Sequence, residues 1–551
     1  MPSRRLAILA TVGLLLGAGL AWQASSSLTA ADAPGSAVAQ PDAAQKLADR
    51  IDALVDAQLK RDNIKPAPLS DDSEFLRRAS LDLCGRTPAG SEVRDFLADQ
   101  SPTKRRAAID RMLDSPTYIV NATNRWHEAM IPEADADDAL KRFSVPTFES
   151  WLRSRIADNR DYAEIVREIL TLPVQGGPMM EAGFVQPSAS TPEAFYRAKQ
   201  AKPENLGAAT SRLFLGVRLE CAQCHDHPFD TWKRDQFWSY AAFFSEFQQP
   251  AGGGGVAETI KAAITPDNHT LKIPDTTPEQ VVSAAFLAGN APDWSDKQAA
   301  REKLANWITS PENPWFARAA ANRVWAQMFG VGIVDPVDDL SAKNPPSHPE
   351  VLDELAKAFV EHKHDLRFLA RAIALSKTYQ RTSRRTDASQ DTPRTFARMP
   401  VRAMSPEQIF DSLAQATGRF TFFDPEQPLN FSNDPARQEF LETFTNDSES
   451  TVERQSTILQ ALTLMNGNFV SSATDIAASQ SLTAVIEAPF LNTPERIETL
   501  FYAALSRAPR AEELDRFRAY VDNGGPEKDP KKALADVFWA LLNSNEFALN
   551  H

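Results

Sequence analysis

Cysteine is the scarcest chemically reactive residue of this sequence, with three copies in 551 residues, and histidine follows with eight. Three cysteines are too few to cross-link a chain of this length, which excludes a disulfide-stabilised scaffold. Positive charge is also in deficit, since 59 Lys and Arg face 73 Asp and Glu and leave a formal net charge of −14. Binding to nucleic acid relies on basic side chains that replace phosphate counterions, so we expect no nucleic-acid partner.

Long apolar runs are lacking except near the N-terminus. Arg4 and Arg5 precede an uncharged, mostly apolar stretch over 6–22, and small residues and proline are frequent after it. This layout is typical of a secretory signal or, if it is not cleaved, of a short membrane anchor. We therefore expect residues 1–44 to be a signal or anchor with a disordered tether. The rest of the protein is expected to be exported, periplasmic or extracytoplasmic, with no other membrane contact.

Helical patterns account for most of the remaining chain, and alternating strand patterns are scarce. Ser405-Pro406-Glu407-Gln408 is a helix start signal, with a hydroxyl N-cap and proline in the first turn, and Thr191-Pro192-Glu193 repeats it. Residues 347–350 fit a capping box that precedes apolar positions spaced as on one helical face. The best strand candidate is short, at 270–273. The predicted fold class is mainly α.

The clearest boundary in the chain lies at 248–296. It contains four consecutive glycines, 252–255, and scattered prolines, a composition typical of a flexible segment. A chain of 551 residues is also too long for a single core. We therefore predict two helical domains, 45–247 and 297–551, joined by a Gly/Pro-rich linker with little β structure.

One motif carries recognisable chemistry. Cys221, Cys224 and His225 form a Cys-x-x-Cys-His sequence, the attachment signature of c-type haem. Two thiols at this spacing can each add to a vinyl group of the porphyrin, and the adjacent imidazole then ligates the iron. The motif predicts haem c as the cofactor. Aromatic residues between 229 and 247 suit a haem pocket, but we favour their interpretation as the core of a helix over 235–247.

His227 leaves two other interpretations of the motif open. Cys221, Cys224, His225 and His227 are four ligands of the kind that zinc binds tetrahedrally. A disulfide or a free thiol pair with no cofactor is the third interpretation. Cys84 stands alone before Gly85, where we expect a helix to end, and is interpreted as a buried free thiol.

Several longer segments resemble a pair of known families. The stretch 214–229, which includes the Cys-x-x-Cys-His motif, resembles the planctomycete-specific cytochrome-like domain. Residues 313–318 and 322–325, and the ending at 542–547, resemble its usual partner, the planctomycete-specific C-terminal domain. The resemblance implies an exported bacterial protein with a cytochrome-like first domain, and it implies little about activity because both families are of unknown function.

Three functions are compatible with these observations. The first is an exported c-type cytochrome-like protein that passes electrons to an extracytoplasmic redox protein or enzyme complex. The second is a binding or scaffold protein with a structural zinc site or a disulfide at the same motif. The third is an uncharacterised extracytoplasmic enzyme, for which no catalytic residue is identified.

Overall fold

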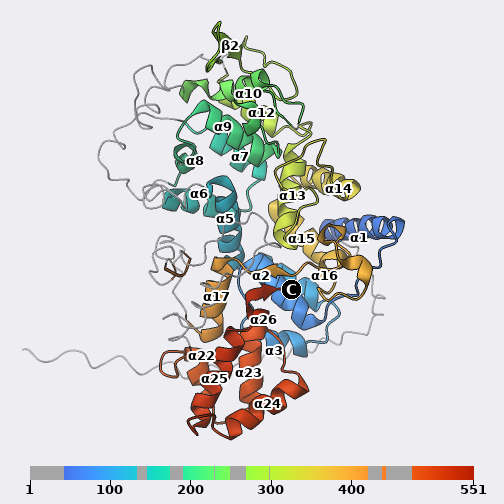
Figure 1. Ribbon diagram of the computed structural model, residues 1–551, viewed down its shortest axis with the longest axis vertical. Helices are drawn as coiled ribbons and strands as arrows, with labels where there is room; N and C mark the ends of the chain where they lie inside the picture. Colours follow the sequence, from blue (N-terminus) through green and yellow to red (C-terminus); the bar gives the residue numbers. More distant parts are fainter. Residues whose placement is uncertain are drawn as a thin grey trace, which may run out of the picture. The chain divides into compact units, whose positions relative to one another are not determined.

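The computed structural model describes residues 42–132, 145–173, 190–228, 230–247, 269–296, 298–419, 437, 439–441 and 474–551. Within these ranges the fold is mainly α, as predicted, and the only sheets are two antiparallel pairs of short strands (Figure 1). Residues 42–551 form one compact unit. The predicted signal and the four glycines at 252–255 lie outside the described residues, so the domain division stays a prediction. No helix in the described ranges is long and apolar enough to cross a membrane.

The first part of the chain builds a group of helices around α2. Up to residue 132 the described helices are α1 (Ala43–Arg61), α2 (Asp72–Cys84), α3 (Gly90–Ala98), α4 (Lys104–Leu113) and α5 (Pro116–Met130). α2 packs against α3, α4 and α5. It ends at Gly85 with φ 74°, as predicted, and a Cβ there would lie 2.8 Å from the Asn121 side-chain oxygen. Cys84 is a free, partly buried thiol that packs against the core.

The second part contains the Cys-x-x-Cys-His motif. Its described elements are α6 (Val145–Ala157), α7 (Tyr162–Leu170), α8 (Glu193–Ala198), α9 (Pro203–Thr210), the π-helical η4 (Ser211–Leu215), the 3₁₀-helical η5 (Glu220–Ala222), α10 (Arg234–Ala241), the 3₁₀-helical η6 (Ala242–Phe247), β1 (Thr270–Ile273) and β2 (Gln280–Ser283). β1 coincides with the predicted strand and pairs with β2, Thr270 opposite Ser283. α10 contacts α9, η6 and β1.

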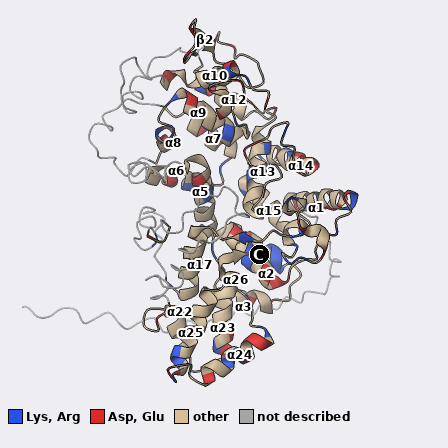
Figure 2. Ribbon diagram, in the orientation of Figure 1, with Lys and Arg blue, Asp and Glu red and all other residues tan. Residues whose placement is uncertain are grey.

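The third part is helical to the C-terminus. Its described elements are α12 (Ala300–Ile308), α13 (Phe316–Phe329), α14 (Pro349–Glu361), α15 (Leu366–Leu375), α16 (Lys377–Gln380), the 3₁₀-helical η7 (Ala388–Gln390) and η8 (Pro393–Thr395), β3 (Arg402–Ala403), α17 (Pro406–Thr417), α22 (Gln480–Glu487), α23 (Thr493–Leu505), α24 (Ala511–Asp522), α25 (Pro530–Leu542), α26 (Asn545–Ala548) and β4 (Leu549–Asn550). Figure 2 shows acidic and basic positions spread over the described helices, with both signs on α24.

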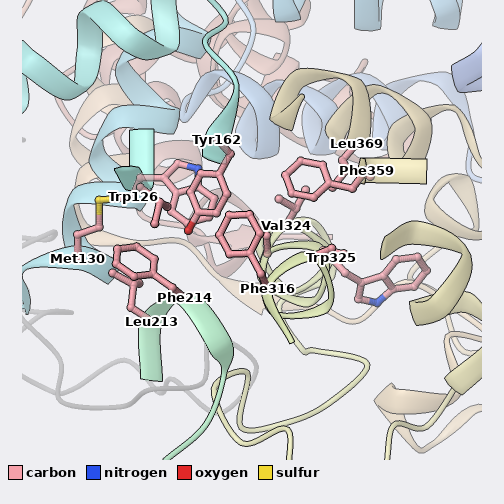
Figure 3. Packing of buried hydrophobic residues seen from close by; sticks show 14 of the residues in the cluster. Trp126, Met130, Tyr162, Leu213, Phe214, Phe316, Val324, Trp325, Phe359 and Leu369 are labelled. Carbon is pink, nitrogen blue, oxygen red and sulfur yellow. The ribbon is translucent and has the colours of Figure 1, made fainter. Parts of the chain in front are cut away.

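The early and late helices pack together. α1 contacts α14, α15 and α16, and α3 contacts α23 (Figure 1). In the larger apolar cluster, Tyr162 of α7 stacks on Phe316 of α13 with ring centroids 5.4 Å apart. Trp126 of α5 lies 4.8 Å from the Tyr162 ring, and Figure 3 shows these three side chains together. Segments on both sides of 248–296 therefore share one core.

Charged side chains of α2 are buried against late segments of the chain. Arg77 donates to the carbonyl oxygens of Ala504 and Phe547, at 3.2 and 2.7 Å. Arg78 donates to the carbonyl oxygen of Tyr379 at 2.8 Å and contacts the carboxylate of Glu74 at 2.6 Å. A buried guanidinium is tolerated only where acceptors surround it. The three hydrogen bonds to carbonyl oxygens attach α2 to residues more than 300 positions away.

Of three predicted helix starts, the structure confirms one and differs at the other two. Ser405 caps α17 as predicted, because its hydroxyl accepts from the Gln408 amide. α8 instead begins at Glu193 with Pro192 as N-cap and no side-chain cap, so the prediction of a Thr191 cap is wrong. α14 begins at Pro349 with His348 as N-cap, so the predicted capping box at 347–350 is also wrong. The apolar face of α14 is buried as its spacing predicts.

Candidate functional site

The Cys-x-x-Cys-His motif lies on a short surface loop between η4 and α10. η4 ends at Gly216, whose φ of 65° turns the backbone, and the chain then enters the single 3₁₀ turn η5. Leu219 and Ala222 are fully buried and attach this turn to the core. Cys221, between these anchors, and Cys224, after them, are both exposed, while Glu220 is partly buried.

The loop is held in place by side chains of α10 and by its own turn. The carbonyl oxygen of Gln223 accepts from Trp238 Nε1 at 3.0 Å and from Arg234 Nε at 3.3 Å. The carboxylate of Asp226 accepts from Lys233 Nζ at 2.9 Å and from the Arg234 amide at 3.1 Å. These hydrogen bonds bracket the Cys224–His225 pair and fix its backbone.

His225 presents one ring nitrogen for ligation. Its Nδ1 lies 2.7 Å from the carbonyl oxygen of Asp226. A carbonyl only accepts, so Nδ1 is the donor in this contact, and Nε2 is the nitrogen left for a metal. Metal-ligating histidines are commonly held in this way, with one nitrogen bonded to a backbone carbonyl and the other directed to the metal. The His225 side chain is exposed, so the donor set of two thiols and one imidazole is compatible with covalent haem.

The four side chains of the zinc alternative do not converge. His227 donates its backbone amide to the carbonyl oxygen of Trp232 at 2.8 Å, which turns the chain back on itself after His225. Among the described residues, no group of three or more His, Cys, Asp or Glu side chains is placed to hold a metal ion. Cys221 and Cys224 are free thiols, with no disulfide between them.

The aromatic residues after the motif belong to the core, as the favoured interpretation predicted. α10 and η6 place them in the larger apolar cluster, where each is at most 4% exposed: Phe237, Trp238, Tyr240, Phe243, Phe244 and Phe247. Trp232 is only partly buried against the same cluster. Phe229 lies outside the described residues. Most of these rings therefore belong to the core that supports the loop.

A polar cleft of about 470 Å³ opens beside Cys221. Residues before and after the motif line it together with residues far along the chain: Arg212, Arg218, Glu220, His227, Asp230, Asp339, Ser341, Lys343 and Asn344. The buried carboxylate of Asp338 pairs with Arg212 and accepts from Arg218 Nη2 at 2.6 Å. The residue pattern gave no signal for this cluster, because Asp338 is 126 and 120 positions from the two arginines that it joins.

Two acids next to these arginines, the buried Asp338 and the partly buried Glu220, have pKa values shifted in opposite directions. Burial raises the pKa of Asp338, but hydrogen bonds and charge from Arg212 and Arg218 outweigh it and lower the pKa overall. Burial raises the pKa of Glu220, and the same two arginines only partly offset it. The charged form of Asp338 is therefore favoured and accepts from both guanidinium groups, while Glu220 is a weaker acid next to Cys221.

Comparison with known families covers most of the chain. Residues 50–249 match the PSCyt2 family, described as a protein of unknown function (DUF1549). Residues 300–433 and 429–521 match the PSD1 family, also described as a protein of unknown function (DUF1553). No curated protein and no solved structure matches the chain. The resemblance predicted from the sequence is confirmed, and the chain carries the paired PSCyt2 and PSD1 domains of unknown function in that order.

Proposed function

We propose that this chain is an exported c-type cytochrome-like protein that carries one haem on the loop at 221–225. Cys221 and Cys224 hold the group through thioether bonds, and His225 ligates the iron. The observation that supports this assignment is the exposure of both thiols beside an imidazole whose Nδ1 is occupied by the Asp226 carbonyl. When bound, haem supplies one-electron transfer between ferric and ferrous iron.

The chain's own residues prepare the loop for this role. Arg234 and Trp238 hold the Gln223 carbonyl, so the two thiols stay on one fixed turn. Asp226 and Lys233 form an exposed ion pair at the end of the loop. A rigid attachment site keeps a redox group at a constant distance from its partner, which is an extracytoplasmic redox protein or enzyme complex in this proposal.

Export agrees with this proposal because covalent haem attachment is completed outside the cytoplasm. Residues 1–44 have the layout of a signal or anchor. We propose that this segment delivers the chain to the compartment where the haem is attached.

The test is the mass and haem content of the full chain made in a host with a haem-attachment system. Wild type is expected to carry the mass of one haem and to keep a haem stain on a denaturing gel. Cys221→Ala and Cys224→Ala are expected to lose the double attachment, whereas Cys84→Ala, at the third and distant thiol, should not. A wild-type mass equal to that of its amino acids would end the proposal, and one zinc per chain would favour the scaffold alternative.

A further inference from the structure

A second cavity, of about 370 Å³, lies where the segment before α14 meets η8. Among the residues that line it are Asp62, Ser347, His348, Thr392 and Arg394. None of them belongs to the loop at 221–225 or to the cleft beside it. The sequence predicted only a helix start here, so this cavity has no assigned role.

Two polar atoms on its walls are buried and unpaired. His348 is 4% exposed, and its Nδ1 lies 3.2 Å from Ser347 Oγ. Its Nε2 has no hydrogen-bond partner within the described part of the chain. Arg394 donates through Nη2 to the Ile333 carbonyl oxygen at 2.8 Å, while its Nε has no partner in the same ranges. Buried polar groups are nearly always hydrogen-bonded, so two unpaired ones in residues lining a single cavity indicate a missing polar partner.

The surroundings of this cavity favour an anion. α14 begins at Pro349, immediately after His348, and no side chain caps its first turn. The positive end of the helix dipole therefore lies next to His348, which lines the cavity. Burial lowers the pKa of His348 to about 4, and the charges of Arg394, Arg61 and Arg381 act in the same direction against Asp62. The imidazole is neutral at pH 7, and Arg394 is the cation that lines the cavity, since Arg381 is paired with Asp56.

We propose that this cavity binds a small oxyanion, with Arg394 as the charged contact and the His348 imidazole and Thr392 hydroxyl as neutral ones. Guanidinium groups suit carboxylate, sulfate and phosphate because their N–H donors match two oxygens of the anion. This inference is independent of the haem proposal, because it uses no residue of the loop at 221–225. Removal of either cysteine should leave anion binding unchanged.

Titration calorimetry of the full chain with inorganic sulfate tests this assignment. The titration is run at pH 7 with sodium chloride at matched ionic strength as the reference. We expect saturable binding at one site in the wild type and at least about ten-fold weaker binding in Arg394→Gln. Arg398→Gln is the matched control, because Arg398 also donates to nearby backbone carbonyls but does not line the cavity.

A second variant keeps the test decisive if Arg394→Gln does not fold. Thr392 is exposed, so Thr392→Val is expected to fold and to weaken sulfate binding by about three-fold. The proposal is overturned if the wild type shows no saturable sulfate binding. It is equally overturned if Arg394→Gln binds as tightly as Arg398→Gln, or if Thr392→Val is the only folded variant and binds like the wild type.

Discussion

His225 and His227 are two residues apart, yet the structure gives them different environments. His225 is exposed and its Nδ1 is bonded to the Asp226 carbonyl oxygen, 2.7 Å away. His227 lines the polar cleft, and its backbone amide is bonded to the Trp232 carbonyl oxygen. The Cys-x-x-Cys-His spacing selects His225 for haem iron, whereas the zinc interpretation uses both histidines. The geometry makes His225 the residue that would determine the iron spectrum under the haem proposal.

His225→Ala tests this difference. We expect the reduced α-band of the haem-loaded wild type to disappear, because the iron loses its axial nitrogen. His227→Ala is the matched control and should keep the band. Reduced-minus-oxidised visible spectra measure both variants. An unchanged α-band in His225→Ala would show that another side chain ligates the iron.

At the scale of single elements, similar start signals lead to different helix ends. The hydroxyl of Ser405 caps α17, and Gln408 completes a reciprocal capping box. Thr191 has the same relation to its following proline and acidic residue, but α8 begins only at Glu193. A cap requires extended backbone at the residue that carries the hydroxyl and helical backbone immediately after it. Pattern alone does not specify that change of conformation.

Ser405→Ala and Thr191→Ala therefore have different expected costs. Loss of the Ser405 cap should lower the free energy of unfolding by about 1 kcal/mol. Thr191→Ala should change it by less than about 0.5 kcal/mol, because that hydroxyl caps no helix. Urea unfolding followed by circular dichroism measures both values. Equal losses in the two variants would contradict the assignment of the caps.

Arg507 joins two C-terminal elements through a bidentate ion pair. It contacts Glu513 of α24 at 2.8 and 2.9 Å and also Glu546 of α26. The hydrogen bond from Arg507 lowers the pKa of Glu513 from 4.5 to about 2, against a smaller effect of burial. A carboxyl group with a lowered pKa adds stability above its unfolded pKa and loses this contribution as the pH falls toward the folded value.

Glu513→Gln should consequently be most destabilising at neutral pH. The difference in unfolding free energy between wild type and Glu513→Gln is expected to shrink steadily between about pH 5 and about pH 3. Glu512→Gln, at the exposed neighbouring position, should show a much smaller dependence. Urea midpoints over this pH series provide the measurement. A constant difference over the whole range would mean that the ion pair does not stabilise the folded state.

At the scale of the whole molecule, Asp82 of α2 is the centre of a buried junction. Its carboxylate accepts two 2.8 Å hydrogen bonds from Arg402 of β3 and one of 2.7 Å from the Tyr379 hydroxyl. Asn550 of β4 donates to it at 2.8 Å. A helix early in the PSCyt2 region, α2, therefore holds the last strand of the chain in place.

Asp82→Ala should destabilise the whole protein by about 3–5 kcal/mol, because it leaves the Arg402 guanidinium buried and unpaired. The matched control is Asp522→Ala, which removes the exposed Asp522–Arg518 pair and should cost less than about 1 kcal/mol. Thermal unfolding followed by tryptophan fluorescence reports both. Similar midpoints for the two variants would show that the buried junction adds nothing to stability.

The sequence alone determined the features that depend on local pattern. The mainly α fold, the α17 cap at Ser405, the buried face of α14 and the strand at 270–273 follow from residue period and capping chemistry, which act over a few neighbours. The Cys-x-x-Cys-His spacing also identified the loop at 221–225 as the candidate site, and longer motifs identified the paired families.

Only the tertiary structure decided where these elements meet. Arg212 and Asp338 are 126 positions apart, and Asp82 and Asn550 are 468 apart, so no local pattern predicts their pairing. The cavity at His348 likewise combines segments near 347 and 394. Charged residues on α2 resemble a solvated face in sequence, and they are buried because distant carbonyl and carboxylate groups satisfy them there.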